Sequence, residues 1–172
     1  PAMRAMTSEP PQEFWPRLRK MFADRGVALV LIEHLPGTGA HGATRWLGNK
    51  ALLQISVRYR WADIFWFTLV HELGHLLLHG KRETFIEYDN GDRKVEEAEE
   101  EANRFASDQL IPPVMYRTFC ARSVGAPARA SILAFAQEIG IAPSVVVGRL
   151  QHDGVVPRNH LNDLRPRFVA KA

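Results

Sequence analysis

The sequence predicts an α+β fold, in which a small, mostly antiparallel sheet packs against one long apolar helix and a helical C-terminal part follows. Two observations support this prediction for the first half of the chain. Stretches rich in β-formers flank a Gly48-Asn49 pair, and an apolar segment spans residues 62–79. In the second half, proline and glycine separate short segments with helical spacing of apolar residues.

Each element in the first half has a local reason in the sequence. Residues 11–26 read as a first helix that glycine stops, and "VALVLIEHL" is apolar and β-rich enough for a buried strand. Residues 43–60 are expected to form a hairpin that turns at Gly48-Asn49. The apolar segment from Ala62 to His79 is the second helix, and Gly80 closes it.

The second half is predicted to be helical after one polar, acidic loop at residues 81–94. A third helix is expected from Val95 to Leu110, since Pro112-Pro113 prevents its continuation. Three further helical segments follow, "VMYRTFC", "ARASILAFAQEIG" and "PSVVVGRLQH".

The length and composition limit the class of protein. A chain of 172 residues fits a single domain over 1–172, which we divide into a core at 10–113 and a helical C-terminal subdomain at 114–172. The single cysteine, Cys120, excludes an internal disulfide framework and fits a reducing cytosol. The sequence shows no secretory signal and no apolar run long enough for a bilayer, so we expect a cytoplasmic protein without a membrane partner.

The stretch "HELGH" in the second helix is the strongest chemical signal. Four residues along a helix advance about 400°, so His75 lies one turn above His71 and only about 40° round the axis. Both imidazoles can therefore bind one ion in the geometry that zinc accepts. Glu72 directly follows His71, close enough to reach a metal-bound water without binding the metal, which is where a general base is needed.

The alternative is a metal-free core helix that contains satisfied histidines. Chance alone produces this five-residue pattern about 0.02 times in a chain of this length. Two imidazoles and a carboxylate are also costly to bury without partners, and this helix is otherwise apolar. Gly74 weakens the helix interior, which is tolerable if another backbone must approach closely there. We therefore favour a metal site.

The acidic third helix supplies the candidates for a third ligand. Relative to Ala102, the apolar positions Ala98, Phe105 and Ala106 fall within about 60°, and Glu99 lies at the edge of that face. The other four glutamates, which point farther towards solvent, are Glu96, Glu97, Glu100 and Glu101. Glu99 is thus the expected ligand, and Asn103 can orient a ligand histidine through its free ring nitrogen.

The histidines outside the five-residue pattern are weaker candidates. His79 repeats the four-residue spacing at the end of the helix, where it is expected to cap carbonyls or support a ligand. His152 can approach the cleft to stabilise an oxyanion, but His34, His41 and His160 are equally open candidates for this role.

Taken together, "FWFTLVHELGHLLLHG" and the later "EEEANRFASDQLIP" resemble the ImmA/IrrE family of bacterial zinc metallopeptidases. The resemblance implies a zincin-like fold and one Zn²⁺ ion bound by His71, His75 and Glu99, with Glu72 as the base. It also implies that the substrate is a helix-turn-helix repressor or antitoxin in a stress-response or toxin–antitoxin circuit. The matching region covers about residues 51–113.

The C-terminal part carries a second, weaker pattern. Residues 135–154 have helix-turn-helix spacing, and the chain from Ala102 onward contains nine Lys or Arg residues and four acidic ones. The would-be recognition helix offers only Ser144, Arg149 and Gln151 to read bases, so we favour a packing role. Nucleic-acid contact through the basic tail residues remains an alternative.

The sequence therefore predicts a zinc endopeptidase that acts on a protein substrate. The alternative is a non-proteolytic regulatory or antitoxin module, in which a structural or sensory zinc supports binding to DNA or to a protein. An intact Glu72 argues against this alternative, since a structural zinc site has no use for a base.

Overall fold

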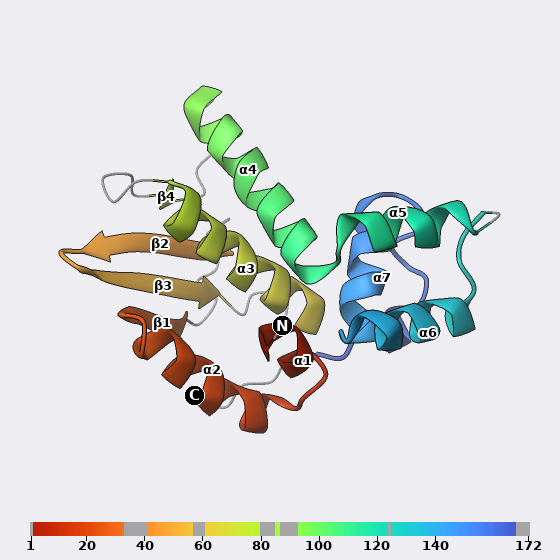
Figure 1. Ribbon diagram of the computed structural model, residues 1–172, viewed down its shortest axis with the longest axis horizontal. Coiled ribbons are helices and arrows are strands. Elements are labelled where there is room, and N and C mark those ends of the chain that lie inside the picture. Colours follow the sequence, from red (N-terminus) through yellow and green to blue (C-terminus); the bar gives the residue numbers. More distant parts are fainter. Residues whose placement is uncertain are drawn as a thin grey trace.

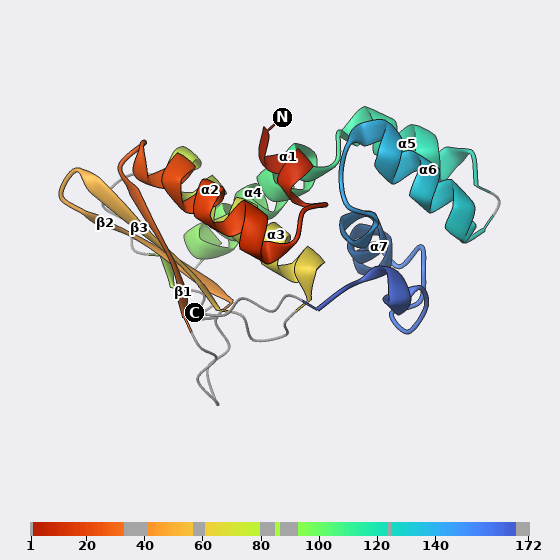
Figure 2. The same ribbon diagram turned by 90° about the horizontal axis from the view of Figure 1, so that it is seen from below.

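A helix-covered sheet at one end of the molecule and a helical cluster at the other make up the α+β fold predicted from the sequence. The computed structural model describes residues 2–32, 41–56, 61–79, 85–86, 93–123 and 125–167. Helices α2 (Pro11–Ala23) and α3 (Ala62–Leu78) cover one face of the sheet (Figure 2). Helices α5 (Pro113–Ala121), α6 (Arg129–Ile139) and α7 (Pro143–His152) lie at the end far from the sheet (Figure 1).

The sheet is mixed but mostly antiparallel, as expected. Its strands are β1 (Val27–Ile32), β2 (Gly42–Leu47), β3 (Lys50–Ser56) and β4 (Phe85–Ile86), in the order β1-β3-β2-β4. Strands β1 and β3 are parallel, whereas β2 pairs antiparallel with both β3 and β4. The predicted turn joins β2 to β3, and Gly48 adopts the positive φ of 61° that such a tight turn requires.

Strand β4 corrects the prediction of a plain loop over residues 81–94. Its two residues pair with Ala43 and Thr44 of β2, so tertiary pairing produces a strand too short to show in the sequence. Gly80 and the rest of this acidic segment up to residue 92 lie outside the described residues.

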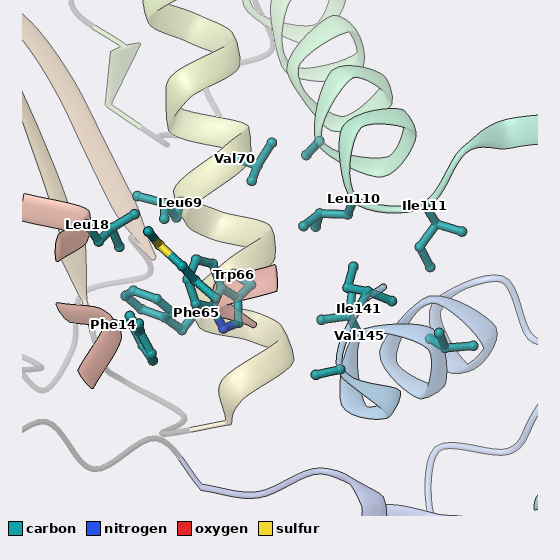
Figure 3. Packing of buried hydrophobic residues seen from close by; sticks show 14 of the residues in the cluster. Phe14, Leu18, Phe65, Trp66, Leu69, Val70, Leu110, Ile111, Ile141 and Val145 are labelled. Atoms are coloured by element: carbon teal, nitrogen blue, oxygen red, sulfur yellow. The ribbon is translucent and has the colours of Figure 1, made fainter. Parts of the chain in front are cut away.

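The main core forms where α2 and α3 meet over the sheet. Phe14 of α2 packs against Phe65 and Trp66 of α3, and Leu18 lies beside Leu69 (Figure 3). The ring centroids of Phe14 and Trp66 are 4.7 Å apart. Full burial of such a side chain contributes about 1.5–3 kcal/mol. This packing anchors α3 as the central helix. A short helix that the sequence did not predict, α1 (Ala2–Met6), precedes α2.

Helix α4 (Arg93–Leu110) crosses α3 at close range (Figure 1). The contact is at Gly74, where an added Cβ would lie 3.3 Å from the Cα of Ala102 and 3.1 Å from the Phe105 ring. The glycine in the middle of α3 is thus explained by a close backbone approach, as the sequence suggested.

The pair α6–α7 has helix-turn-helix geometry, but its second helix is buried. The two helices meet at 116° around Gly140, which is left-handed. Two of the three residues proposed to read bases, Ser144 and Gln151, are buried. Helix α7 therefore packs inward, in agreement with the favoured prediction. Within the described part of the chain no single helix is both long and apolar enough to cross a membrane.

Hydrogen bonds from Arg165, in the segment after α7, connect α7 to the start of α3. Arg165 donates from Nη2 to Oδ2 of the buried Asp63 at 2.7 Å and from Nη1 to the side-chain oxygen of Gln151 at 2.7 Å. Gly148 of α7 makes room for this pair, because a Cβ there would lie 2.5 Å from the same Asp63 oxygen. The 3-10 helix η1 (Asn162–Leu164) lies in the same segment.

Candidate metal centre

Helix α3 presents two histidines to one point in the interior. His71 and His75 are 7% and 2% exposed, and their Nε2 atoms are 3.0 Å apart. The apolar residues around them hold this part of α3 inside the protein, between the sheet and α4. The predicted one-turn spacing thus places two nitrogen donors side by side.

Helix α4 brings a carboxylate to the same point. Its Glu99 places Oε2 at 3.2 Å from His71 Nε2 and Oε1 at 3.2 Å from His75 Nε2. The close contact at Gly74 allows this approach, since Ala102 packs there one turn after Glu99. The remaining glutamates of the acidic run, Glu96, Glu97, Glu100 and Glu101, are exposed.

These three side chains fit a divalent metal ion. One donor atom from each lies within 4.8 Å of the others. Zinc–ligand bonds of about 2.0–2.1 Å at tetrahedral angles place ligand atoms about 3.3 Å apart. The observed separations of 3.0 and 3.2 Å are close to that value. Three protein ligands also leave the fourth position of a tetrahedral site for water, as in catalytic zinc sites.

The charges of the cluster also favour a cation. Burial alone would raise the pKa of Glu99, but hydrogen bonds from His71 and His75 outweigh it and lower the pKa to about 2. Burial alone would lower the pKa of His71, but its contacts with Glu99 and the charge of Glu72 raise it. The carboxylates thus favour positive charge at this point, which a metal ion would supply.

Asn103 orients one of the two histidines. Its Oδ1 lies 3.0 Å from His71 Nδ1. When Nδ1 carries the proton, the ring donates it to the amide oxygen, and the lone pair of Nε2 points into the cluster. Asn103, one turn after Glu99 on α4, therefore makes the contact with a histidine ring nitrogen that was predicted from the sequence.

Glu72 is held by a strand that the sequence did not connect with the site. The buried Thr44 of β2 donates its hydroxyl to Glu72 Oε2 at 2.6 Å. On the same strand, an added Cβ at Gly42 would lie 2.4 Å from Glu72 Oε1. Strand β2 therefore fixes one carboxylate oxygen and leaves just enough room for the other. No motif links residues 42–44 to α3, so only the tertiary structure reveals this contact.

The other histidines lie outside the three-residue cluster. His79 ends α3, where its backbone N–H donates to the carbonyl of His75, and its ring is 5.2 Å from that of His75. His41 and His152 line the cavity described next, whereas His34 falls outside the described residues. The carbonyl of His160 accepts a hydrogen bond from the side chain of Gln151.

A cavity of about 510 Å³ opens beside the cluster. His71, Glu72 and Asn103 line one end of it. From there it extends along the first half of α3 to α7 and Arg165. Its volume lies within the range of about 300–1,000 Å³ that is typical of ligand sites.

The chain matches a known protein family over about half of its length. Residues 62–150 match the family model described as Peptidase_M78, IrrE N-terminal-like domain. This region contains α3 and α4, and therefore the whole His71–His75–Glu99 cluster. No curated protein matches the chain.

Proposed function

The chain belongs to the IrrE N-terminal-like domain family, Peptidase_M78, and on this premise we propose that it is a zinc-dependent endopeptidase. In this proposal His71, His75 and Glu99 bind one Zn²⁺ ion, and Glu72 is the general base. The observation that carries the proposal is the His-His-Glu cluster with a buried, oriented carboxylate next to it.

When bound at this cluster, Zn²⁺ supplies Lewis-acid chemistry, which polarises a peptide carbonyl and lowers the pKa of water to about 7. Glu72 accepts the proton of the attacking water on its carboxylate and then delivers it to the nitrogen of the leaving amine. Thr44 keeps that carboxylate in place throughout, because its hydroxyl binds Oε2. Asn103 keeps the His71 ring oriented.

We further propose that the substrate is a protein, namely a helix-turn-helix repressor or an antitoxin in a stress-response or toxin–antitoxin circuit. The family resemblance supports this proposal, together with a cavity large enough for a peptide segment beside the cluster. We place this activity in the cytoplasm, where such transcription regulators act.

The test compares the zinc-loaded wild-type protein with Glu72→Gln. Each is incubated with candidate repressors from the genomic neighbourhood and with a peptide library made from a bacterial lysate, and mass spectrometry identifies new termini. We expect site-specific cleavage by the wild type and, in Glu72→Gln, full zinc content with cleavage lowered by at least about a hundredfold. Equal cleavage by the two proteins would refute the role of Glu72.

The same experiment addresses the non-proteolytic alternative. A regulatory module with a structural zinc would bind the metal in both proteins and cleave nothing in either. That result would reject the peptidase proposal while keeping the metal site.

A further inference from the structure

The cavity beside the metal cluster has two chemically different parts. Its lining includes apolar side chains from three helices, namely Ile64 and Phe67 of α3, Leu110 at the end of α4 with the following Ile111, and Val145 of α7, besides the polar Thr68, Asn103 and Ser107. Phe67 lies one turn before His71, and the two rings are 6.2 Å apart. An apolar substrate side chain next to the cluster can therefore be buried against Phe67.

The acidic groups of the lining already have partners. Asp63 accepts two hydrogen bonds from Arg165, at 2.7 and 3.1 Å, so this pair contributes little net charge. Glu72 accepts a hydrogen bond from Thr44 at the other end of the cavity. Neither carboxylate is placed to attract a basic substrate side chain to the α7 end.

Basic side chains line the α7 end of the cavity. Arg149, His152 and Arg158 all contribute to it. Arg149 is fixed in place, because its Nε donates to Asp153 at 2.7 Å and its guanidinium stacks over the ring of Tyr116 at 5.1 Å. Arg158 is exposed, and no carboxylate among the described residues forms an ion pair with it.

Asp153 is not part of the lining but contacts two residues of this end, Arg149 and His152. It accepts hydrogen bonds from Arg149 and Tyr116, and one of its oxygens is 3.1 Å from His152 Nδ1. Burial alone would raise the pKa of Asp153, but these contacts, with Arg149 foremost, outweigh it and lower the pKa. Asp153 thus stays ionised and orients Arg149. Because Asp153 pairs with Arg149 and not with Arg158, the positive charge of Arg158 can bind a ligand.

We propose that this cavity binds a substrate segment with a large apolar side chain beside the scissile bond and a carboxylate side chain at the α7 end, where Arg158 recognises it. The proposal rests on the peptidase function proposed above and adds the class of substrate. An acidic peptide is the occupant favoured over a nucleic acid, because the cationic end is continuous with an apolar wall and a hydrolytic centre.

Peptide binding to zinc-loaded Glu72→Gln, which cannot turn over its ligand, tests this proposal. Two fluorescein-labelled peptides share a central Leu-Phe pair and carry either glutamates or lysines on both sides. A third peptide has the glutamates and a central Ser-Ser pair. Fluorescence anisotropy at low and moderate salt yields the dissociation constants.

We expect the glutamate peptide to bind about fivefold more tightly than the lysine peptide at low salt, which is the upper range for one exposed ion pair. Salt should reduce the difference. Arg158→Glu should remove or reverse the preference, and the Ser-Ser peptide should bind more weakly than its Leu-Phe counterpart. Arg122→Glu, the same charge change at an exposed residue outside the cavity lining, should leave the preference intact.

Three outcomes would overturn the proposal: no binding of the glutamate peptide, equal binding of both charged peptides, or a preference that Arg158→Glu leaves unchanged. A single-stranded DNA oligonucleotide that binds more tightly than the glutamate peptide and depends on Arg158 would also overturn it, in favour of a nucleic-acid surface. Cleavage of the glutamate peptide by the zinc-loaded wild type is scored separately. Charge-selective binding without cleavage would reject the peptidase function alone, and cleavage without selectivity would reject the acidic subsite alone.

Discussion

At the scale of single residues, two residues of strand β2 restrict the position of the Glu72 carboxylate. A general base works only if its carboxylate stays within reach of the water that it deprotonates. Thr44 supplies a hydrogen bond of 2.6 Å, and Gly42 leaves no room for a side chain. Both residues act through Glu72, so we regard them as positioning residues for the proposed base.

Removal of the Thr44 hydroxyl should therefore affect turnover more than binding. We expect Thr44→Val to lower kcat on the order of tenfold, the loss of about one hydrogen bond to a charged group, with KM nearly unchanged. Steady-state kinetics on a peptide that the wild type cleaves would measure both constants, and metal analysis would verify full zinc content.

Thr44→Ser is the matched control, because it keeps the hydroxyl and loses only a methyl group. It should retain most of the wild-type kcat. If Thr44→Val and Thr44→Ser lost activity equally, the effect would come from packing and the positioning role would be wrong.

At the scale of elements, the contact between α3 and α4 decides whether the cluster can form. The ligands come from two helices that meet at Gly74, where even a methyl group would be crowded by Ala102 and Phe105. The distance between the helices therefore controls the distance between Glu99 and the two histidines.

Gly74→Val should push α4 outward and weaken metal binding. We expect the zinc affinity to fall by at least about tenfold, since a branched side chain cannot fit a gap this narrow without displacement of the partner helix. Competition with a chromophoric chelator measures the affinity, and far-UV circular dichroism verifies that the helices remain. Leu77→Val, at an exposed position of the same helix, should leave the zinc affinity unchanged.

The same contact explains which parts of the site could be predicted from the sequence. The positions of His71, Glu72 and His75 follow from the rise and turn of one helix. Glu99 could be predicted from its angular position relative to the buried face of α4, because the angles between residues round a helix axis do not change when the helix packs. Thr44 and Gly42 could not be selected, since strand–helix packing depends on residues far apart in the chain. Strand β4 escaped prediction for the same reason.

At the scale of the whole molecule, one buried ion pair connects the C-terminal segment to the helix that carries the site. Arg165 and Asp63 are 12% and 7% exposed in their side chains, and they join the last described residues to the start of α3. In the sequence Arg165 is only one of several basic residues near the end of the chain, and its role could not be predicted because its partner lies 102 positions earlier.

Breaking this pair should destabilise the protein strongly. Arg165→Met leaves the Asp63 carboxylate buried without its cation, which costs about 3–5 kcal/mol in the free energy of unfolding. Urea denaturation followed by tryptophan fluorescence measures this change. The double variant Asp63→Leu/Arg165→Met removes both charges and should recover most of the loss. A double variant no more stable than Arg165→Met would contradict this explanation.

The central claim is that Glu99 completes a zinc site begun by His71 and His75. The most direct test is the zinc affinity of Glu99→Gln, determined by chelator competition and compared with that of Glu100→Gln, its exposed neighbour on the same helix. We predict one zinc ion per wild-type chain, an affinity at least about a hundredfold lower in Glu99→Gln, and a wild-type affinity in Glu100→Gln. Equal zinc affinities in the two variants would contradict the account.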